Sequence, residues 1–309
     1  MKILITGGTG FIGSYLVKEL IKHNYRIKIF TRDGTKISHH IDTIIGDLTT
    51  YEDCLNAMDD TDVVFHNAAY ATDYGKKKII NNININGTKN ILKACEMRGI
   101  NRIIYTSTAG VYGFPNNLKE INEKSKIQPY NIYHKSKYEG EKILSKNKKI
   151  KLSIVRPPLV LGANGKGSKI IIDKILNGKM IYIGSGNQYI PIVHPFDVAQ
   201  CLILALEHDK IGETFNVVSF HCRIKDLFNE ISKQLKVRAP AKKMPYFLAY
   251  LPAYVNEKIN INGPSLTRFR LKSLGTSRII SCDKAIKKLK YKPKFNLEKT
   301  VRDIIKNTK

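Results

Sequence analysis

A tyrosine and a lysine four residues apart, Tyr133 and Lys137, are the strongest candidates for proton-transfer chemistry in this sequence. A spacing of four places both side chains on one face of a helix. A nearby cation lowers the pKa of a phenol, which could then exchange a proton with a carbonyl or hydroxyl oxygen. The same spacing occurs at three other places in this lysine-rich chain: Tyr74/Lys78, Tyr138/Lys142 and Tyr254/Lys258. The spacing alone therefore does not identify a catalytic pair.

The position of Tyr133 in the chain distinguishes it from the other three tyrosines. It lies near the start of a predicted helix, and Thr108 follows a predicted strand 25 residues earlier. A hydroxyl group at that strand end could bond the same substrate oxygen as the tyrosine. Taken alone, Ser107 and Thr108 are more typical of a polar turn. Together, the three residues Thr108, Tyr133 and Lys137 predict a catalytic set.

A glycine-rich turn, TGGTGFIG over residues 6–13, joins the first predicted strand to the first predicted helix. Gly7 permits the tight turn, Gly10 lets the backbone approach a pyrophosphate, and Gly13 allows close packing of the helix on the sheet. The helix N-terminus adds N–H donors and the positive end of the helix dipole. We expect a dinucleotide to bind here, with Phe11 and Ile12 also in contact; the alternative is a strand-helix turn without a ligand.

The end of the second predicted strand bears on which dinucleotide binds. An acid there bonds the ribose 2′-hydroxyl, whereas an arginine accepts a 2′-phosphate. Residues 30–33 read Phe-Thr-Arg-Asp, so both types are present. We expect Arg32 to meet the cofactor, with a solvated surface charge as the alternative. Asp47, after the third predicted strand, is placed to reach the adenine, with a helix cap as the alternative.

Strands alternate with helices through the first half of the chain, which favours a parallel sheet covered on both faces. The predicted strands are 2–6, 26–31, 43–46, 61–66, 102–106 and 151–156, and the predicted helices are 11–24, 79–98 and 130–146. Pro157 and Pro158 end the last of these strands, and the alternation loosens after them.

This pattern predicts an α/β fold, namely a Rossmann-type doubly wound parallel sheet with a smaller C-terminal substrate-binding lobe. We assign residues 1–158 and 191–219 to the dinucleotide-binding domain. Residues 159–190 and 220–309 form the predicted substrate-binding lobe.

Composition and charge exclude several classes of protein. The chain has 309 residues, of which 42% are apolar, so it can bury a core and is not disordered. Its formal net charge of +26 comes from 52 Lys and Arg against 26 Asp and Glu. These basic residues are spread along the chain without a nucleic-acid-binding signature. We therefore expect no nucleic-acid partner, although anionic ligands would feel the positive field.

The N-terminus and the cysteines indicate a compartment. A glycine occurs at position 7, where a signal peptide needs a longer apolar stretch, and no apolar run of about 18 residues is long enough to span a membrane. The five cysteines form no CxxC pair and no cluster with metal-ligand spacing. We expect a cytoplasmic protein with free thiols and no bound metal.

Taken in order, these motifs resemble the extended short-chain dehydrogenase/reductases, also called the NAD-dependent epimerase/dehydratase family. The segments that carry the resemblance are 6–13, 46–48, 66–69, 84–88, 107–113, 133–137, 155–158, 193–199 and 289–293. Residues 72–75 and 245–264 look most like the branch of 3β-hydroxysteroid dehydrogenases and dihydroflavonol reductases. The resemblance implies an enzyme. The intact set of Thr108, Tyr133 and Lys137 argues against the competing interpretation, a non-catalytic dinucleotide sensor or a basic nucleic-acid binder.

The resemblance also implies roles for single residues. Tyr133 would be the acid/base, and Lys137 would bond the nicotinamide ribose and lower the tyrosine pKa. The other residues implied to contact or support the cofactor are Asp47, Leu48, Ala68, Ala69, Asn84 and Pro158. His194 and Asp197 are more typical of residues that tie two lobes together.

Two departures from the family pattern bear on cofactor and substrate. Thr31 stands where NAD-preferring members carry an acid, and Arg32 follows as in NADPH-using relatives, so we expect NADP, with NAD as the alternative. Ile190 stands where many nucleotide-sugar enzymes carry an arginine for the diphosphate, although Arg268, Arg270 or Arg278 could substitute. We therefore expect a dehydrogenase or reductase of a secondary alcohol or ketone. The alternative is a nucleotide-sugar epimerase or dehydratase with tightly bound NAD.

Residues 242–251 read KKMPYFLAYL, two lysines followed by an aromatic run. This segment could lie on an acidic membrane and admit an apolar substrate. The alternative is a helix packed on the core of the substrate lobe. We also expect the protein to be a homodimer.

Overall fold

The computed structural model describes residues 1–34, 41–115, 119–208, 212–259 and 266–307. Its centre is a seven-stranded sheet in the order β10-β6-β5-β4-β1-β2-β3, with every neighbouring pair parallel. The strands are β1 (Lys2–Thr6), β2 (Arg26–Thr31), β3 (Asp42–Ile45), β4 (Val63–His66), β5 (Arg102–Thr106), β6 (Lys151–Arg156) and β10 (Glu213–Asn216). β1, β2, β5 and β6 begin and end at the predicted residues, whereas β10 was not predicted as a strand.

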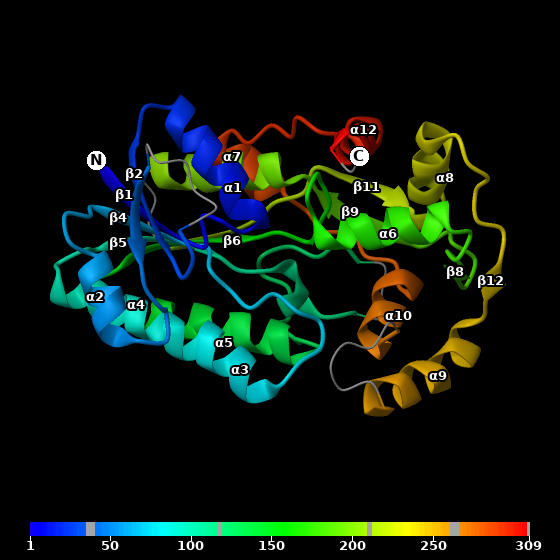
Figure 1. Cartoon of the computed structure of the whole chain (residues 1–309), viewed down its shortest axis with the longest axis horizontal. Helices are drawn as coiled ribbons and strands as arrows, with labels where there is room; N and C mark the ends of the chain where they lie inside the picture. The colour runs from blue at the N-terminus through cyan, green and yellow to red at the C-terminus, as the bar shows by residue number, and fades with distance from the viewer. Residues whose placement is uncertain (35–40, 116–118, 209–211, 260–265, 308–309) are drawn as a thin grey trace.

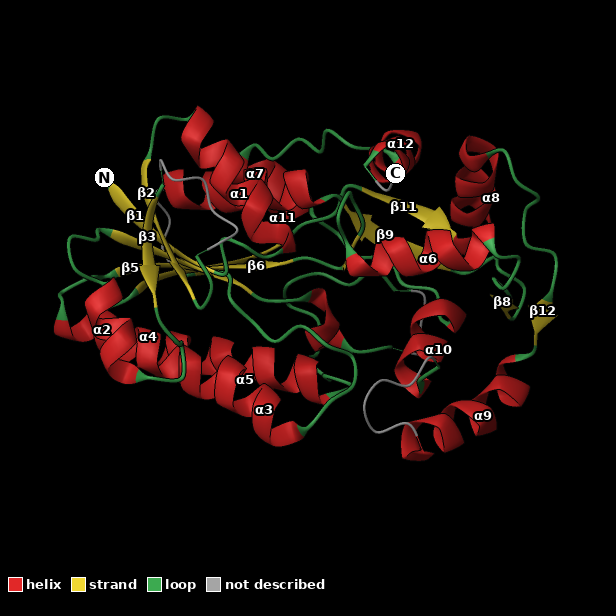
Figure 2. Ribbon diagram, in the orientation of Figure 1, coloured by secondary structure: helices red, strands yellow, loops and turns green. Residues whose placement is uncertain are grey.

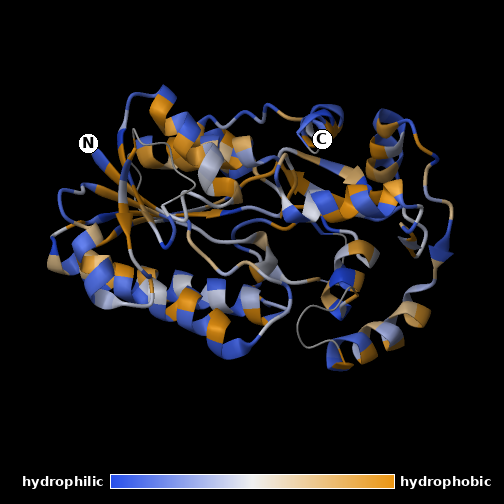
Figure 3. Ribbon diagram, in the orientation of Figure 1, coloured by the Kyte–Doolittle hydropathy of each residue, from blue (hydrophilic) through white to orange (hydrophobic). Residues whose placement is uncertain are grey.

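Helices cover both faces of the sheet, which lies between them as a yellow layer in Figure 2. One face packs on α1 (Phe11–Lys22), α7 (Pro195–Glu207) and α11 (Asp283–Leu289); the other packs on α2 (Tyr51–Ala57), α4 (Gly87–Met97) and α5 (Ile132–Lys146). In β1, Ile3 and Ile5 join the first core and Leu4 joins the second. Because both faces are buried, the inner strands such as β1, β4 and β5 are largely hydrophobic, and orange predominates in this layer in Figure 3. The doubly wound fold is confirmed.

Two predicted helices differ from the structure in detail. Helix α1 ends at Lys22 because Asn24 adopts a left-handed φ of +59°, which terminates the helix earlier than predicted. The predicted helix 79–98 is a continuous helical run made of α3 (Lys77–Asn81), a π-helical turn η1 (Asn82–Asn86) and α4. Such π turns are frequent at functional sites, and Asn84 lies in this one.

A smaller lobe follows β6 and lies at the other end of the molecule (Figure 1). Its strands are β7 (Leu159–Val160), β8 (Tyr182–Ile183), β9 (Tyr189–Val193), β11 (Phe220–Arg223) and β12 (Lys243–Met244). Its helices are α6 (Lys166–Leu176), α8 (Ile224–Leu235), α9 (Tyr246–Ile259), α10 (Arg268–Gly275) and α12 (Leu297–Lys306). A separate core holds this lobe together, with Ile172, Phe228 and Ile304 among its buried residues.

Contacts between α7 and the C-terminal segment connect the two lobes. The Nε2 atom of His194 lies 3.0 Å from Oδ2 of Asp303 in α12, and the His194 ring stacks on Phe295 at 3.5 Å. The buried Asp197 carboxylate accepts hydrogen bonds from the backbone N–H groups of Lys294 (2.9 Å) and Phe295 (3.3 Å). Helix α11 packs on the central sheet, although its residues were assigned to the substrate-binding lobe. The division of the chain into a dinucleotide-binding domain (1–158 and 191–219) and a substrate-binding lobe (159–190 and 220–309) therefore stays a proposal.

Candidate active site

The predicted site residues follow strand ends at one edge of the sheet. Gly7, Arg32, Ala68, Thr108 and Pro158 come directly after, or within two residues of, β1, β2, β4, β5 and β6. Because all these strands are parallel, their carboxyl ends meet at the same edge, where open α/β sheets bind their ligands. The topology therefore brings together residues that are far apart in sequence.

The turn between β1 and α1 can be built only from glycine at two positions. Gly7 has a φ of +69°, and a Cβ atom there would lie 2.7 Å from Cα of Ala68. A Cβ atom at Gly13 would overlap the carbonyl oxygen of Gly7 and come within 2.8 Å of Cα of Gly8. Gly10 is the exposed N-cap of α1, whose first turn carries no acid. This bare helix N-terminus fits the pyrophosphate of a dinucleotide.

A chain of hydrogen bonds holds the ends of β1 and β4 together. The Ala68 N–H donates to Thr6 Oγ1 at 3.1 Å, and Thr6 Oγ1 lies 2.9 Å from Nδ1 of His66. The His66 Nε2 atom lies 2.9 Å from Thr88 Oγ1, which donates to the carbonyl oxygen of Asn84 at 2.7 Å. Burial, with the charge of Lys137, lowers the pKa of His66 to about 3, so its ring stays neutral. No role was predicted for His66 from the sequence. Its position as a polar residue at the end of an apolar strand could have indicated a buried hydrogen-bonding role.

Arg32 and Asp47 lie at the β2–β3 end of the same edge. Arg32 is exposed, and its charge adds to the hydrogen bond from the Thr49 N–H in lowering the pKa of Asp47. Oδ1 of Asp47 accepts that bond and a second from Thr49 Oγ1, both at 2.8 Å, so this oxygen caps a turn. The Leu48 side chain is buried in the second core, so a contact of Leu48 with adenine must come from its backbone.

Thr108 has the polar-turn role that the sequence suggested, and this role is compatible with the predicted catalytic one. It is the N-cap of η2 (Ala109–Tyr112), where its Oγ1 accepts a hydrogen bond from the Gly110 N–H at 3.0 Å. The hydroxyl proton remains available to donate. Because the His134 ring packs directly against Gly110, η2 contacts the start of α5, which carries Tyr133.

Helix α5 places Tyr133 and Lys137 one turn apart, and Lys137 is almost fully buried. The helix begins at Asn131, whose Oδ1 accepts a hydrogen bond from the His134 N–H at 2.8 Å. Burial raises the pKa of the Tyr133 phenol to about 12 and lowers the pKa of the Lys137 ammonium to about 7. The expectation that Lys137 lowers the tyrosine pKa is therefore not met in the free protein. Desolvation opposes both charged forms, and the Lys137 Nζ lies over the Tyr105 ring, 4.0 Å from its centre.

Two buried groups fix the position of α5. Asn84 in η1 donates from Nδ2 to Ser136 Oγ at 2.8 Å, and its Oδ1 accepts from the Tyr70 N–H at 2.8 Å. Asn84 thus holds the loop after β4 against the helix. Arg156 at the end of β6 forms a two-point ion pair with Glu141 of α5, at 2.9 and 2.5 Å. Sequence analysis missed Glu141, although it lies on the Tyr133–Lys137 face of the helix.

Aromatic rings join the start of α5 to α10 of the smaller lobe. Phe269 of α10 lies 5.1 Å from the His134 ring and 5.9 Å from Phe114. Tyr130 packs edge-on against Phe114 at 5.4 Å. This aromatic cluster, Phe114, Tyr130, His134 and Phe269, forms an apolar wall beside Tyr133, whose ring lies 5.6 Å from that of His134.

The three arginines proposed from sequence as anion ligands have different surroundings. Arg268 pairs with Glu257 and Arg270 pairs with Asp73, each at 2.7 Å. The Arg278 guanidinium lies 4.6 Å from the centre of the Phe114 ring, and its buried Nε has no hydrogen-bond partner.

Other polar atoms around the site are also buried without a partner. They include Ser107 Oγ and Nδ1 of His134. Unpaired buried polar atoms are costly, so a ligand that hydrogen-bonds with these atoms would stabilise the site. Ile190, in contrast, is buried in the core of the smaller lobe and offers only apolar contacts there.

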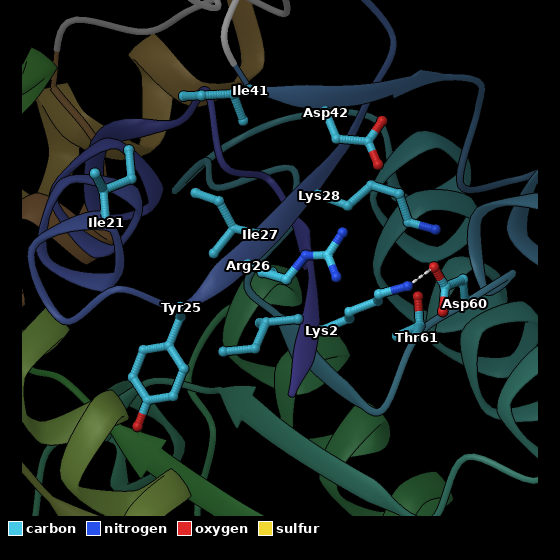
Figure 4. A pocket seen from close by; sticks show the side chains of 11 residues that line it. Lys2, Ile21, Tyr25, Arg26, Ile27, Lys28, Ile41, Asp42, Asp60 and Thr61 are labelled. Atoms are coloured by element: carbon cyan, nitrogen blue, oxygen red, sulfur yellow. Dashed lines mark hydrogen bonds and ion pairs between the residues drawn. The ribbon is translucent and has the colours of Figure 1, made fainter.

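A surface pocket lies at the opposite edge of the sheet (Figure 4). It is lined by residues at the amino ends of the strands, such as Lys2, Arg26 and Asp42, and Lys2 pairs there with Asp60. None of the predicted site residues lines it. Three cations and two acids line it, and none of the motifs discussed above contributes to it, so we do not assign it a ligand.

The structure describes all five cysteines, and each is a free thiol. Within the described ranges, no group of three or more His, Cys, Asp or Glu side chains could hold a metal ion.

Comparisons with known proteins identify the family of this chain. A family model described as the NAD dependent epimerase/dehydratase family matches residues 3–218. Sterol-4-alpha-carboxylate 3-dehydrogenase, decarboxylating, from Mus musculus is 27% identical and covers 97% of this chain and 89% of its own length. N-acetyl-alpha-D-glucosaminyl-diphospho-ditrans,octacis-undecaprenol 4-epimerase from Escherichia coli O157:H7 is 28% identical and covers 82% and 78%.

Among solved structures, the UDP-glucuronic acid 4-epimerase from Bacillus cereus in complex with NAD is similar at a TM-score of 0.80. It is 23% identical and covers 99% of this chain and 98% of its own. At this level of identity the similarity shows the same fold.

Proposed function

The chain belongs to the NAD-dependent epimerase/dehydratase family, and from this we propose that it is an NAD(P)-dependent oxidoreductase acting on a secondary alcohol or ketone. Dehydrogenases and epimerases are both among its relatives, so the chain is an enzyme. One packing contact carries the proposal: η2 packs against the start of α5. This contact places Thr108 beside the helix that carries Tyr133 and Lys137.

Each residue of this set has a distinct role in the proposal. During reduction of a ketone, the Tyr133 hydroxyl gives its proton to the oxygen of the substrate; during oxidation, the phenolate takes that proton back. Thr108 Oγ1 accepts a hydrogen bond from the Gly110 N–H, and its O–H group donates a hydrogen bond to the same substrate oxygen. Lys137, in its protonated form, stabilises the Tyr133 phenolate. When bound, the nicotinamide cofactor supplies or accepts the hydride.

The proposed cofactor is NADP, with NAD as the alternative. Arg32 supports it, since the side chain is exposed at the end of β2 and Thr31 takes the place of the acid that would bond a 2′-hydroxyl. The turn of Gly7, Gly10 and Gly13 fits the pyrophosphate of either dinucleotide.

Arg32→Asp should weaken NADPH binding by roughly 10–100-fold, because it removes a charge-assisted hydrogen bond to the 2′-phosphate. NADH binding should be unchanged or stronger. Both are measured by fluorescence titration of the purified enzyme. Arg26→Asp is the matched control, since Arg26 is exposed at the opposite end of the same strand. Tighter binding of NADH than of NADPH by the unmodified protein would contradict the NADP proposal.

A second candidate function is that of a nucleotide-sugar epimerase or dehydratase, which Arg278 favours. Arg278, whose buried Nε lacks a hydrogen-bond partner, lies beside the aromatic cluster and could hold a diphosphate, which needs fixed cations in a desolvated cleft. Ile190 argues in the other direction, since it leaves the usual arginine position apolar.

Incubation of the purified enzyme with UDP-glucose or UDP-galactose, without added cofactor, separates the two functions. We expect no interconversion of the sugars. We expect activity instead in a panel of ketones and secondary alcohols with NADPH or NADP⁺, followed by absorbance of the reduced cofactor. Interconversion of the sugars would establish the epimerase and reject the oxidoreductase.

A further inference from the structure

Helix α9 presents an almost wholly apolar face to the outside of the molecule. Phe247 is 74% exposed, Leu251 67% and Ile259 72%. Leu248 and Val255 are also exposed on this helix, whereas Tyr250 and Tyr254, although partly exposed, contact Arg268 with their side chains. Only Ala249 and Ala253 are buried. The alternative open from the sequence, a helix with its aromatic run packed on the lobe core, is therefore wrong for most of these side chains.

The inner face of α9 is firmly attached, so the exposure of its outer face is a property of the folded lobe. Ala249 and Ala253 pack with Leu271 of α10 in one cluster. Glu257, in the last turn of α9, pairs with Arg268 at 2.7 Å. The helix lies at the periphery of the molecule, away from the central sheet (Figure 1).

The chain around this face is strongly basic. Between residues 236 and 256 there are four cations and no acid. The cations are Lys236, Arg238, Lys242 and Lys243, and all four are exposed. The first acid that follows, Glu257, is neutralised by Arg268.

We propose that the α9 face, defined as the exposed apolar side chains of α9 together with Lys242 and Lys243, docks on the surface of an anionic lipid bilayer. A contiguous apolar face flanked by lysines matches the acyl boundary and the anionic headgroups of such a surface. A second copy of this chain fits less well, since it would bring two basic surfaces together. The helix has 14 residues and is about 21 Å long, shorter than the roughly 30 Å of a bilayer core, so it lies on the bilayer. In the described part of the chain, no helix is long and apolar enough to cross a membrane.

The opposite face of α9 points toward the candidate active site. The Tyr74 hydroxyl donates to the carbonyl oxygen of Glu257, and Tyr246 of α9 and Arg268 are close enough to Tyr130 to interact with it electrostatically. A substrate dissolved in lipid would thus enter beside the aromatic cluster. This consequence rests on the proposed function, whereas the docking itself does not.

Flotation of the full chain with vesicles tests the docking. We expect binding to vesicles of phosphatidylcholine with phosphatidylglycerol, and little binding to phosphatidylcholine alone. The double variant Phe247→Ser/Leu251→Ser should reduce the affinity at least about tenfold, and so should Lys242→Glu/Lys243→Glu. All four side chains have exposed positions, so the variants should fold normally, which thermal denaturation checks.

Two matched controls separate the α9 face from the general positive charge of the protein. Ile170→Ser/Leu176→Ser removes apolar side chains of α6 that are 48% and 51% exposed, and Lys148→Glu/Lys149→Glu reverses an exposed lysine pair before β6. Both should bind nearly as the unmodified chain does. The proposal would be overturned if the Lys148→Glu/Lys149→Glu control lost as much vesicle binding as Lys242→Glu/Lys243→Glu, or if Phe247→Ser/Leu251→Ser lost none. The proposal would also be overturned if light scattering showed that the unmodified chain is a dimer and that the Phe247→Ser/Leu251→Ser variant is a monomer.

Discussion

Tyr133→Phe should lower turnover by roughly 10²–10⁴-fold, the usual contribution of a positioned acid/base. The substitution removes one oxygen atom and leaves the ring in place beside His134. The affinity for NAD(P)H should barely change, because the turn of Gly7 to Gly13, which we propose binds the pyrophosphate, is untouched. Steady-state kinetics with the best substrate of the panel and fluorescence titration of the cofactor measure the two effects.

The pH dependence of the reaction gives an independent check on Tyr133. Burial raises the pKa of its phenol to about 12, so below that pH only a small fraction is phenolate. This fraction grows as the pH rises, so alcohol oxidation should accelerate with pH in the weakly alkaline range, above the pKa of about 7 at which Lys137 loses its charge. The residual activity of Tyr133→Phe should lack this rise.

Tyr138→Phe is the matched control on the same helix. Five residues turn it about 140° away from Tyr133, and its ring lies 5.3 Å from the Lys142 ammonium. Its turnover should stay close to that of the unmodified enzyme. Near-normal turnover in Tyr133→Phe would remove Tyr133 from the mechanism.

Gly13→Ala should largely abolish cofactor binding. The added Cβ atom overlaps the Gly7 carbonyl oxygen, so α1 must move away from the turn that is proposed to receive the pyrophosphate. Backbone shifts of this kind cost about 1–3 kcal/mol in well-packed sites, and here the shift also displaces the N–H donors of the helix. We expect the dissociation constant of NAD(P)H to rise at least about a hundredfold, as measured by fluorescence titration.

Gly167→Ala provides the control for a glycine-to-alanine change in a helix. Gly167 lies in α6, and a Cβ atom there meets nothing within 4 Å. This variant should bind the cofactor normally and be as stable as the unmodified chain or more so. Normal cofactor binding by Gly13→Ala would show that the β1–α1 turn does not receive the pyrophosphate.

The local sequence pattern was sufficient to predict most strands of the central sheet and many residues of the candidate site. β1, β2, β5 and β6 are apolar runs with clear boundaries, so their limits could be read from the sequence. The glycine turn and the Tyr133–Lys137 spacing are also local. Once the strands are parallel, the carboxyl ends must meet, and this places Gly7, Arg32 and Thr108 at one edge without further information.

Contacts between distant segments could not be predicted in this way. The Thr6–His66–Thr88 chain and the ion pair of Glu141 with Arg156 depend on which strands and helices lie side by side. Arg278 comes from the C-terminal part of the chain, and only the packing of the smaller lobe sets it against Phe114. No periodicity in the sequence carries this information.

The amino-acid sequence by itself thus determined the fold class, the dinucleotide turn and the identity of the proposed catalytic residues. Only the tertiary structure decided how strongly those residues are desolvated, which raises the pKa of Tyr133 and lowers that of Lys137. It also decided that the apolar face of α9 stays uncovered. Both properties depend on burial, and burial is set by segments far away in the chain, whereas helix spacing and strand pattern are set by neighbouring residues.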